Sequence, residues 1–358
     1  MSKRIRVAIA GVGNCASALI QGVYYYQDVS DEEIIPGLMH TNLGGYRVKD
    51  IEFVAAFDID SRKIGRDLSE AIFSGENNTR KFAEVPKIGV EVMRGPVLDG
   101  IGKYLKGVIP IDENQKPVNV SEVLREVKAD MLINFLPVGS ENASRWYAQQ
   151  ALEANCAFVN CIPVFIASDK EWQEKFKEKQ LPLAGDDVMS QIGATVLHKT
   201  IVKLLVDRGV IVDESYQLNV GGDTDFLNML EKERLKSKEI SKTSAVQAMT
   251  PYKVPLKIGP SDYIPFLKNK KICYIWIKGR YFGNTPVYID AKLDVWDAPN
   301  SAGVVIDVIR SIKIALDRGI GGPLISISAF AFKHPPIQVP YHIAKQWVED
   351  FIQGKRER

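Results

Sequence analysis

The 358-residue sequence is poor in the residues that build disulfide frameworks and structural metal clusters. Its four cysteines, Cys15, Cys156, Cys161 and Cys273, are widely separated and show no Cys-x-x-Cys spacing. We therefore interpret them as reduced thiols in a reducing compartment. The four histidines are equally scattered, which argues against a zinc site. A hard cation, divalent or ammonium, stays open, but the sequence assigns it no ligands.

Long apolar runs and an excess of one charge sign are also lacking. The N-terminal "MSKRIRVAIAGVGNCAS" resembles a secretory signal only until its apolar run breaks at Gly11. No segment approaches the roughly 18 uninterrupted apolar residues that a membrane span needs. The formal net charge of +2 creates no broad field for gripping phosphate backbones. We expect a cytoplasmic protein with neither a membrane nor a nucleic acid as partner.

The sequence contains the composition and length of a two-domain globular protein, with 46% apolar and 25% charged residues. We expect an α/β fold, in which a Rossmann-like, doubly wound parallel sheet is joined to a second α+β domain with an open, largely antiparallel sheet. The predicted divisions are 1–195 for NAD binding, 196–298 for catalysis and oligomerisation, and 299–358 for a C-terminal segment returning to the first domain.

The first motif is the strand, turn and helix opening "IRVAIAGVGNCASALIQGV". Gly11 permits a tight turn, Gly13 lets the backbone approach a pyrophosphate, and Ala16 allows close packing of helix and strand. The helix N-terminus would face the phosphates. A purely structural glycine-rich turn is the alternative.

The acidic residue that receives the ribose hydroxyls should end the second strand, and "DIEFVAAFDID" supplies Asp58 there. An acidic residue favours NAD over NADP. Its late position is explained by an insertion over residues 24–48. Asp60 is the alternate ligand, or else the cap of a helix predicted over 61–73.

Three further strand and loop units follow, in "ADMLINFLPVGSENASRWYAQQALEAN", "CAFVNCIPVFIAS" and "LPLAGDDVMSQIGAT". In parallel sheets ligands gather at the carboxyl ends of strands, so residues 134–140, 160–163 and 185–195 should face the cofactor. A helix then runs to Gly209, with Leu204 among its inward residues. Ser190 either helps to form an anion pocket at that helix N-terminus or simply caps it.

Beyond residue 211 the apolar pattern alternates with a period of two, which predicts strands up to Trp296. Lys278 shares a strand face with Tyr274 and Trp276, and Asp297 continues an apolar stripe. These two charges are candidates for a semi-buried site. An apolar helix from residue 299 should pack on the first domain, and Lys333 follows a predicted apolar strand.

The stretch "EKERLKSKEISKTS" has two interpretations. Lys238 and Lys242 are four residues apart, so they lie on one helix face, where like charges repel. A solvated surface helix is one interpretation. The other is that both lysines belong to a site, whereas Lys236 stays on the surface.

Together these motifs resemble one family, inositol-3-phosphate synthase, also called myo-inositol-1-phosphate synthase, in its short prokaryotic form. The resemblance runs in order along nearly the whole chain. It rests on the stretches "GVGNCAS", "FDIDSRKIG", "NFLPVGSENA", "GDDVMSQIGAT", "LNVGGDTDFLNMLE", "RLKSKEISKT", "GPSDY", "DVWDAPNSAGVVIDVIR" and "RGIGGP".

The resemblance implies that NAD-dependent chemistry converts D-glucose 6-phosphate to 1L-myo-inositol 1-phosphate, which is 1D-myo-inositol 3-phosphate. Oxidation at C5 acidifies C6, the enolate closes the ring on the C1 aldehyde, and the ketone is reduced again. Fixed cations would stabilise the oxyanion formed at each step. A homotetramer is implied as well.

The resemblance also assigns residues to this site. The implied catalytic residues are Lys238, Lys242, Lys278, Lys333, Asp187, Asp225 and Asp297. The implied substrate contacts are Ser190, Gln191, Gly193, Ala194, Thr195 and Asn228, with Met189 departing from an expected lysine. The cofactor contacts are Gly11, Gly13, Asn14, Cys15, Ala16, Asp58, Pro137, Ser140, Asn160, Asp186 and Asp187.

Two other functions use the same plan. An NAD-dependent sugar-phosphate dehydrogenase would produce NADH in net amounts, whereas a redox-sensing NAD-binding protein would have little use for a lysine-rich site.

Overall fold

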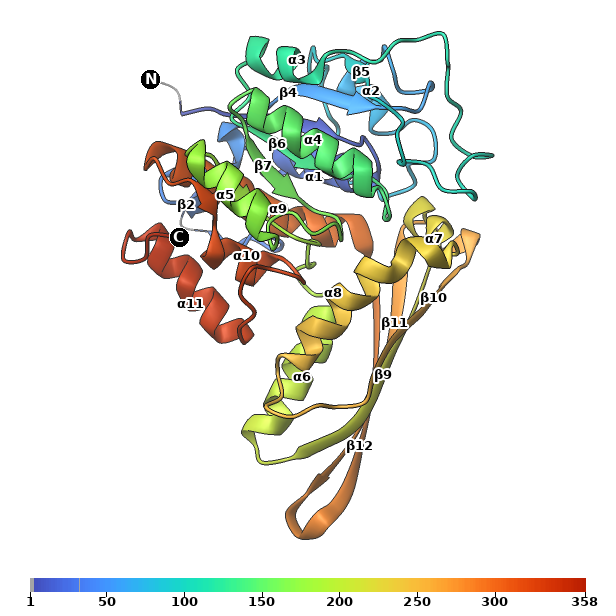
Figure 1. The fold of residues 1–358 in the computed structure, drawn as a ribbon, viewed down its shortest axis with the longest axis vertical. Helices are drawn as coiled ribbons and strands as arrows, with labels where there is room; N and C mark the ends of the chain where they lie inside the picture. Colours follow the sequence, from blue (N-terminus) through green and yellow to red (C-terminus); the bar gives the residue numbers. More distant parts are fainter. Residues whose placement is uncertain (1–2, 32) are drawn as a thin grey trace.

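The computed structural model describes residues 3–31 and 33–358 of the chain. They form an α/β part and a second part whose long sheet extends away from it, with the tip of one hairpin at the far end (Figure 1). Met1, Ser2 and Glu32, which belong to the N-terminal run and the predicted insertion, lie outside the described residues.

The first part is built on a seven-stranded sheet in the order β13-β8-β7-β6-β1-β4-β5. Every neighbouring pair is parallel. The strand order reverses at β1, between β6 and β4, and this is where a doubly wound sheet opens a crevice for ligands. The strands are β1 (Ile5–Ala10), β4 (Ile51–Asp58), β5 (Val92–Arg94), β6 (Met131–Asn134), β7 (Ala157–Asn160), β8 (Pro182–Ala184) and β13 (Gly322–Pro323).

Helices cover both faces of this sheet because its central strand is apolar on both sides. Ile5, Val7 and Ile9 belong to one buried cluster, whereas Ala8 and Ala10 belong to another. The predicted doubly wound sheet is confirmed. The first cluster is completed by α1 (Asn14–Tyr25), α2 (Leu68–Ala71), α9 (Asp297–Asp317), α10 (Ile325–Ala331) and α11 (Tyr341–Ile352), and the second by α3 (Val120–Glu126), α4 (Glu141–Glu153) and α5 (Lys170–Glu178).

The second part is a four-stranded sheet in the order β10-β9-β11-β12. Only the β9–β10 pair is parallel, so the expectation of a largely antiparallel sheet is confirmed. Helices α6 and α8 pack on one face, where Val202 and Val246 meet Ile275 and Ile277. The elements are α6 (Ala194–Asp207), β9 (Ile211–Gly221), α7 (Thr224–Asn228), η2 (Lys232–Leu235), α8 (Lys236–Gln247), β10 (Leu256–Tyr263), η3 (Pro265–Leu267), β11 (Lys270–Tyr281), η4 (Phe282–Asn284) and β12 (Thr285–Trp296).

The insertion before β4 forms a small hairpin and one helical turn, β2 (Asn42–Leu43), β3 (Tyr46–Arg47) and η1 (Val48–Asp50). Arg310 of α9, which is fully buried, donates to the carbonyl oxygens of His40, Thr41 and Tyr46. The insertion is therefore held against the helix that returns to the first part.

The helix predicted over 61–73 is wrong. Asp60 accepts hydrogen bonds from the backbone N–H and the guanidinium of Arg62. Gly65 has a φ of +81°, so the chain turns instead of continuing as a helix. Only α2 is helical, and its cap is Asp67 rather than Asp60.

Two further local predictions fail. The apolar run before Lys333 is the helix α10 rather than a strand. Leu204 of α6 is 58% exposed, and the buried residues of that helix include His198, Lys199 and Val202. The helix does end before Gly209, as expected. Its partners come from β9 and the chain near Val339, which an apolar helical pattern does not reveal.

Helix α9 packs in the first cluster against β1, which confirms the returning helix. The divisions at 195 and 298 stay predictions. Among the described residues, no helix combines the length and apolar character needed to cross a membrane.

Candidate active site

A cavity lies at the carboxyl ends of β1, β4, β6 and β7 and extends to α8 and the start of β11. The β1–α1 turn contributes Gly11, Gly13, Asn14 and Cys15 to its lining, and the loop after β6 contributes Phe135, Leu136, Pro137 and Val138. The expected cofactor-facing segments therefore do meet there. Individual side chains within those segments differ, as described below.

The β1–α1 turn has the geometry of a phosphate-binding turn. Gly11 has a φ of +91°, and a Cβ there would lie 2.9 Å from the Phe135 carbonyl oxygen, so only glycine fits. A Cβ on Gly13, which caps α1, would meet no described atom within 4 Å, which leaves open space above the helix N-terminus. Ala16 is buried and packs against the sheet, as its predicted role requires.

Asp58 ends β4 and lines the cavity. Its Oδ2 accepts a hydrogen bond from the Val12 N–H at 2.7 Å, and its Oδ1 accepts from Ile59 N–H at 2.7 Å. Lys63 is buried beside it and donates to the Val12 carbonyl oxygen at 2.9 Å. Asp58 thus both faces the cavity and fixes the β1–α1 turn.

Three lysines from distant parts of the chain also line the cavity: Lys238, Lys271 and Lys333. Lys238 Nζ donates to Asp225 at 2.7 Å, and Lys271 Nζ lies 3.3 Å from each oxygen of Asp297. Each ammonium group is thus paired with a carboxylate and largely removed from solvent. Lys238, Lys333, Asp225 and Asp297 were all expected in the site.

Asp187 anchors the third lysine. Its side chain is 3% exposed, and it accepts from Lys333 Nζ at 2.8 Å and from Ser241 Oγ at 2.6 Å. Burial alone would raise the pKa of the Asp187 carboxyl, but the ammonium groups of Lys333 and Lys238 lower it below its usual value. Asp187 therefore stays ionised and ties α8 to the chain after α10.

Lys242 lies one turn after Lys238 on α8 and is 7% exposed. Burial is the largest reason that its pKa is lowered to about 7, and the ammonium groups of Lys238, Lys271 and Lys333 lower it further. This lysine can hold a neutral amine near neutral pH. The solvated-surface interpretation of Lys238 and Lys242 is wrong in this fold.

Two acidic groups meet where α7 begins. Burial and the charges of Asp225 and Asp297 raise the pKa of the Asp223 carboxyl to about 7. Burial would also raise the pKa of Asp225, but Lys238, Lys271 and Lys242 hold it below its usual value. Asp223 Oδ2 accepts a hydrogen bond from Asn269 at 2.7 Å. Asp223 is therefore a proton-holding group, and Asp225 an ionised one.

The thiol of Cys15, at the β1–α1 turn, is not activated as a nucleophile. Burial and the nearby carboxylates of Asp297 and Asp223 raise the pKa of the Cys15 thiol to about 12. Cys15 therefore faces the cavity as a neutral thiol.

The expected position of Lys278 is wrong. Lys278 is 37% exposed and pairs with Glu214 at 2.9 Å on the outer face of the sheet. The lysine that β11 places in the cavity is Lys271. Alternation along the strand would have revealed it, because Lys271 begins the stripe that continues through Cys273, Ile275 and Ile277 into the core.

Three polar residues expected to contact the cofactor are buried beneath the cavity instead. Asp186 accepts from the backbone N–H groups of residues 166–168 and from Asn160 Nδ2 at 2.7 Å. Asn160 also accepts from Asn134, and Ser140 Oγ donates to the Pro137 carbonyl oxygen at 2.6 Å. These side chains shape the loops because their polar atoms are needed by buried backbone.

The predicted phosphate cradle is only partly brought to the cavity. Ser190 lines it, and its Oγ lies 3.3 Å from Ser301 Oγ, while the cap of α6 is Gly193 rather than Ser190. Gln191 donates to the Gly37 carbonyl oxygen at 2.9 Å. Ala194 packs in the core below α6 and Thr195 is buried.

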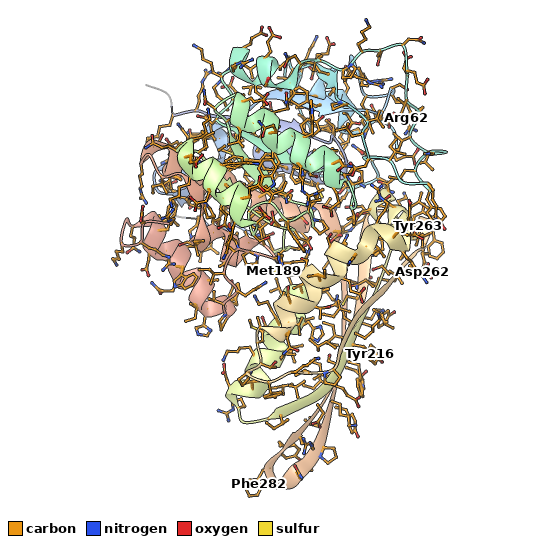
Figure 2. The ribbon with its side chains drawn as sticks, in the orientation of Figure 1. Arg62, Met189, Tyr216, Asp262, Tyr263 and Phe282 are labelled. Atoms are coloured by element: carbon orange, nitrogen blue, oxygen red, sulfur yellow. The ribbon has the colours of Figure 1, made fainter. Side chains whose placement is uncertain are left out.

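Met189 and Asn228 also turn away from the cavity. Met189 is buried, and its N–H donates to the Ala331 carbonyl oxygen at 2.7 Å; Figure 2 labels it where the two parts of the molecule adjoin. Asn228 is buried as well and donates to the Val138 carbonyl oxygen at 2.7 Å, so its expected contact with the substrate is not what the geometry provides.

Sequence reasoning missed Lys63, Asp223, Asn269 and Lys271. Asp223 carries a sequence signal, since Asp followed by Thr-Asp at a strand end is a helix cap beside a second carboxylate. Lys63 and Asn269 lie in turns, where the sequence has no periodic apolar pattern that would indicate which way a side chain points. Among residues 3–31 and 33–358, no group of three or more His, Cys, Asp or Glu side chains is arranged to hold a metal ion.

Comparisons with known proteins agree on one family. The sequence model described as myo-inositol-1-phosphate synthase matches residues 193–298. Inositol-3-phosphate synthase from Mycobacterium tuberculosis is 53% identical over 356 residues, covering 99% of this chain and 97% of that protein. The synthase from Mycolicibacterium smegmatis is 52% identical, with 98% of each chain covered. The crystal structure of a myo-inositol-1-phosphate synthase-related protein from Thermotoga maritima superimposes with a TM-score of 0.81 at 27% identity, covering 98% of each chain.

Proposed function

Because this chain belongs to the inositol-3-phosphate synthase family, we propose that it converts D-glucose 6-phosphate to 1D-myo-inositol 3-phosphate with bound NAD. One observation carries the proposal at the level of chemistry. Lys238, Lys271 and Lys333 face the same cavity as the β1–α1 turn, so a nucleotide and an oxyanion-forming substrate would meet between them.

The residues present fit NAD. Gly13 leaves room above the N-terminus of α1, where backbone N–H groups bind a pyrophosphate. Asp58 ends β4 as the acceptor for ribose hydroxyls, and an acidic group there would repel the additional phosphate of NADP. When bound, NAD would supply the acceptor for the hydride lost from C5 and the donor that returns it.

The lysines would act on the oxygens of the sugar. Oxidation at C5 produces a ketone, loss of a C6 proton gives an enolate, and attack on the C1 aldehyde closes the ring. Negative charge develops on oxygen at each stage, and fixed ammonium groups in a site partly closed to water stabilise such charges. Asp225, Asp297 and Asp187 keep those groups in place through ion pairs.

Lys242 is the residue best suited to accept a proton, because its lowered pKa provides a free amine near neutral pH. Asp223, which lines the cavity and whose pKa is raised to about 7, would be a second proton-exchanging group. The phosphate of the substrate is a second acceptor for the C6 proton. A Schiff base on one lysine is chemically allowed, but the ammonium groups that are paired with carboxylates are poor nucleophiles.

The decisive experiment mixes the pure protein with NAD and glucose 6-phosphate. We expect an inositol phosphate to accumulate, detected as periodate-sensitive product, without growth of NADH absorbance. Net NADH formation would instead support a sugar-phosphate dehydrogenase. NAD binding without any turnover would support a sensor protein.

The proposal includes a cytoplasmic homotetramer. It is supported by the sheet face opposite α6 and α8, where Tyr216, Leu218, Tyr274 and Tyr288 are exposed beside Trp276. Figure 2 labels Tyr216 on this sheet and Phe282 at the tip of the β11–β12 hairpin. An apolar face of this extent is expected to be covered by another subunit. The proposal assigns no ligands to a divalent or ammonium cation.

A further inference from the structure

The segment 228–237, which links α7 to the catalytic helix α8 and which we call the clasp, is fastened to the nucleotide-binding part of the molecule. Arg234 donates from Nε to the Val138 carbonyl oxygen at 3.1 Å and from Nη2 to the Asp99 carbonyl oxygen at 2.8 Å. Asn228 donates to the same Val138 oxygen at 2.7 Å. The clasp is therefore bonded to two loops, one that contains Asp99 and one that contains Val138.

Two other residues of the clasp make further hydrogen bonds to the same region. Glu231 accepts a hydrogen bond from the Lys103 N–H at 2.7 Å, and Ser237 donates to Glu141 of α4 at 2.8 Å. Asp99 in turn accepts from the N–H groups of Asn142 and Ala143, so the loop that receives Arg234 also caps α4. The attachments form a continuous network rather than isolated surface pairs.

Two glycines make room for the clasp. A Cβ on Gly139 would lie 2.6 Å from Arg234 Cβ and Nε. A Cβ on Gly102 would meet the Glu231 carboxylate and would lie 2.8 Å from Asn228 Oδ1 and 3.0 Å from Arg234 Cδ. A Cβ at either position would therefore push against side chains of the clasp.

Both loops that bond to the clasp also line the cavity. Gly100 and Ile101 line it from one loop, and Pro137 and Val138 from the other. Lys238 follows Ser237 directly, and Lys242 lies one turn later on the same helix. The clasp thus stands between the loops around the cofactor cavity and the lysines that act on the substrate.

We propose that Arg234 is a positioning residue, which acts by locking α8, with Lys238 and Lys242, onto the two cavity loops. This inference rests on the proposed function for its effect on turnover. A loosened α8 would still carry both lysines, but it would not hold them against the reacting oxygens. A displacement of about 1 Å costs up to about 100-fold in rate.

The test uses two variants that loosen the clasp from opposite sides, Arg234→Ala and Gly102→Ala. Gly102 has no positive φ, so alanine suits its backbone and acts only through its contact with the clasp. We expect kcat to fall about 10- to 100-fold in both, with KM for glucose 6-phosphate changing less than kcat and the Kd for NAD staying within about threefold. Amide exchange in residues 236–247 should accelerate while that of α4 stays close to the parent.

Arg125→Ala, on the exposed side of α3, is the matched control and should leave both readouts unchanged. The inference is overturned if both clasp variants keep kcat within twofold of the parent. It is equally overturned if NAD affinity, melting temperature and kcat fall together, because the segment would then be an ordinary part of the fold. If the parent forms no inositol phosphate, the proposed function fails. Amide exchange of residues 236–247 in the NAD complex then still tests whether Arg234 holds α8 in place.

Discussion

At the scale of single residues, the site depends on the competition between burial and charge. Lys242 and Asp223 are both buried, and each has neighbours of its own sign, so both have a pKa near 7. Lys271 is partly buried, which would lower its pKa, but Asp297 and Asp225 raise its pKa above the usual value. The ion-paired lysines that line the cavity are therefore accompanied by two groups that can exchange protons near neutral pH. Asp223 lines the cavity, whereas Lys242 does not line it but is influenced by the charges of the lysines that do.

Replacing Lys242 by alanine should abolish inositol phosphate formation, with a loss of at least about 100-fold. The cavity side that fits NAD does not include this residue, so binding of NAD should persist in calorimetric titration. Turnover close to that of the parent would refute the catalytic role of Lys242.

Lys242 should also make stability depend on pH. Its folded pKa is about 7 and its ordinary value 10.5, so between these values the unfolded chain holds more protons than the folded one. Stability should therefore rise with pH across that window, by at most about 1.4 kcal/mol per unit. Denaturant unfolding of the parent and of Lys242→Met between pH 6.5 and 9 measures this slope, which the variant should reduce.

Lys199, whose burial lowers its pKa to about 8, provides the comparison. Lys199→Met should reduce the slope only above about pH 8. An identical slope in the parent and the Lys242 variant would contradict the lowered pKa of Lys242.

Asp58→Ala should weaken NAD binding, because it removes both the acceptor for the ribose and the bond that fixes Val12 in the turn. We expect at least a tenfold rise in the Kd for NAD, corresponding to the loss of a hydrogen bond to a charged group. Asp28→Ala is the control, since Asp28 is exposed and does not line the cavity. Equal affinity in the Asp58 variant and the parent would count against this assignment.

At the scale of elements, the alternation of side chains along strand β11 determines which of its lysines lines the cavity. Its two faces alternate, so Lys271 enters the cavity and Lys278 meets Glu214 outside. The resemblance to the family assigned Lys278 to the site, and its place on a strand face with Tyr274 and Trp276 supported a semi-buried position. The burial pattern of the strand corrects that assignment.

The strand supplies a matched pair of variants. Lys271→Ala should lower kcat by about 100-fold or more, because an ammonium group facing the substrate oxygens is lost. Lys278→Ala should keep kcat within about twofold, since an exposed ion pair contributes little. Steady-state assays of both proteins, once their oligomeric states are shown to match, would reverse the assignment if Lys278→Ala were the impaired one.

At the scale of the whole molecule, the single chain leaves one face of the second sheet uncovered, with Tyr216, Leu218, Tyr274 and Tyr288 exposed on it. Tyr216 stacks on Trp276 of the neighbouring strand there, and Tyr288 packs against Trp276 at a tilt. Such residues are typical of the centres of subunit interfaces.

Light scattering of the pure protein should therefore give the mass of a tetramer. Placing charges on the sheet with Tyr216→Glu and Tyr274→Glu together should produce smaller species, because burying two carboxylates in an apolar interface is costly. Tyr104→Glu, at a residue of similar exposure elsewhere, should not. A parent protein that scatters as a monomer would overturn the tetramer.

Much of this protein follows from its sequence alone. Continuous apolar runs identified central strands of the parallel sheet, and alternation with a period of two identified three strands of the second sheet. Gly11 and Gly13 identified the cofactor turn, because such signals arise from local backbone geometry. The resemblance to the family added Lys238, Lys242 and Lys333, which no local pattern distinguishes from surface lysines.

Only the tertiary structure decided which polar groups face the cavity. Asp186, Asn160 and Ser140 have polar side chains and lie in segments that reach the cavity. Their side chains nevertheless form hydrogen bonds with backbone groups beneath it. Lys63, Asn269 and Arg234 act through partners more than 25 positions away, as in the bond from Arg234 to Val138. Local sequence fixes φ, ψ and periodicity, whereas burial and charge pairing depend on which distant segments become neighbours.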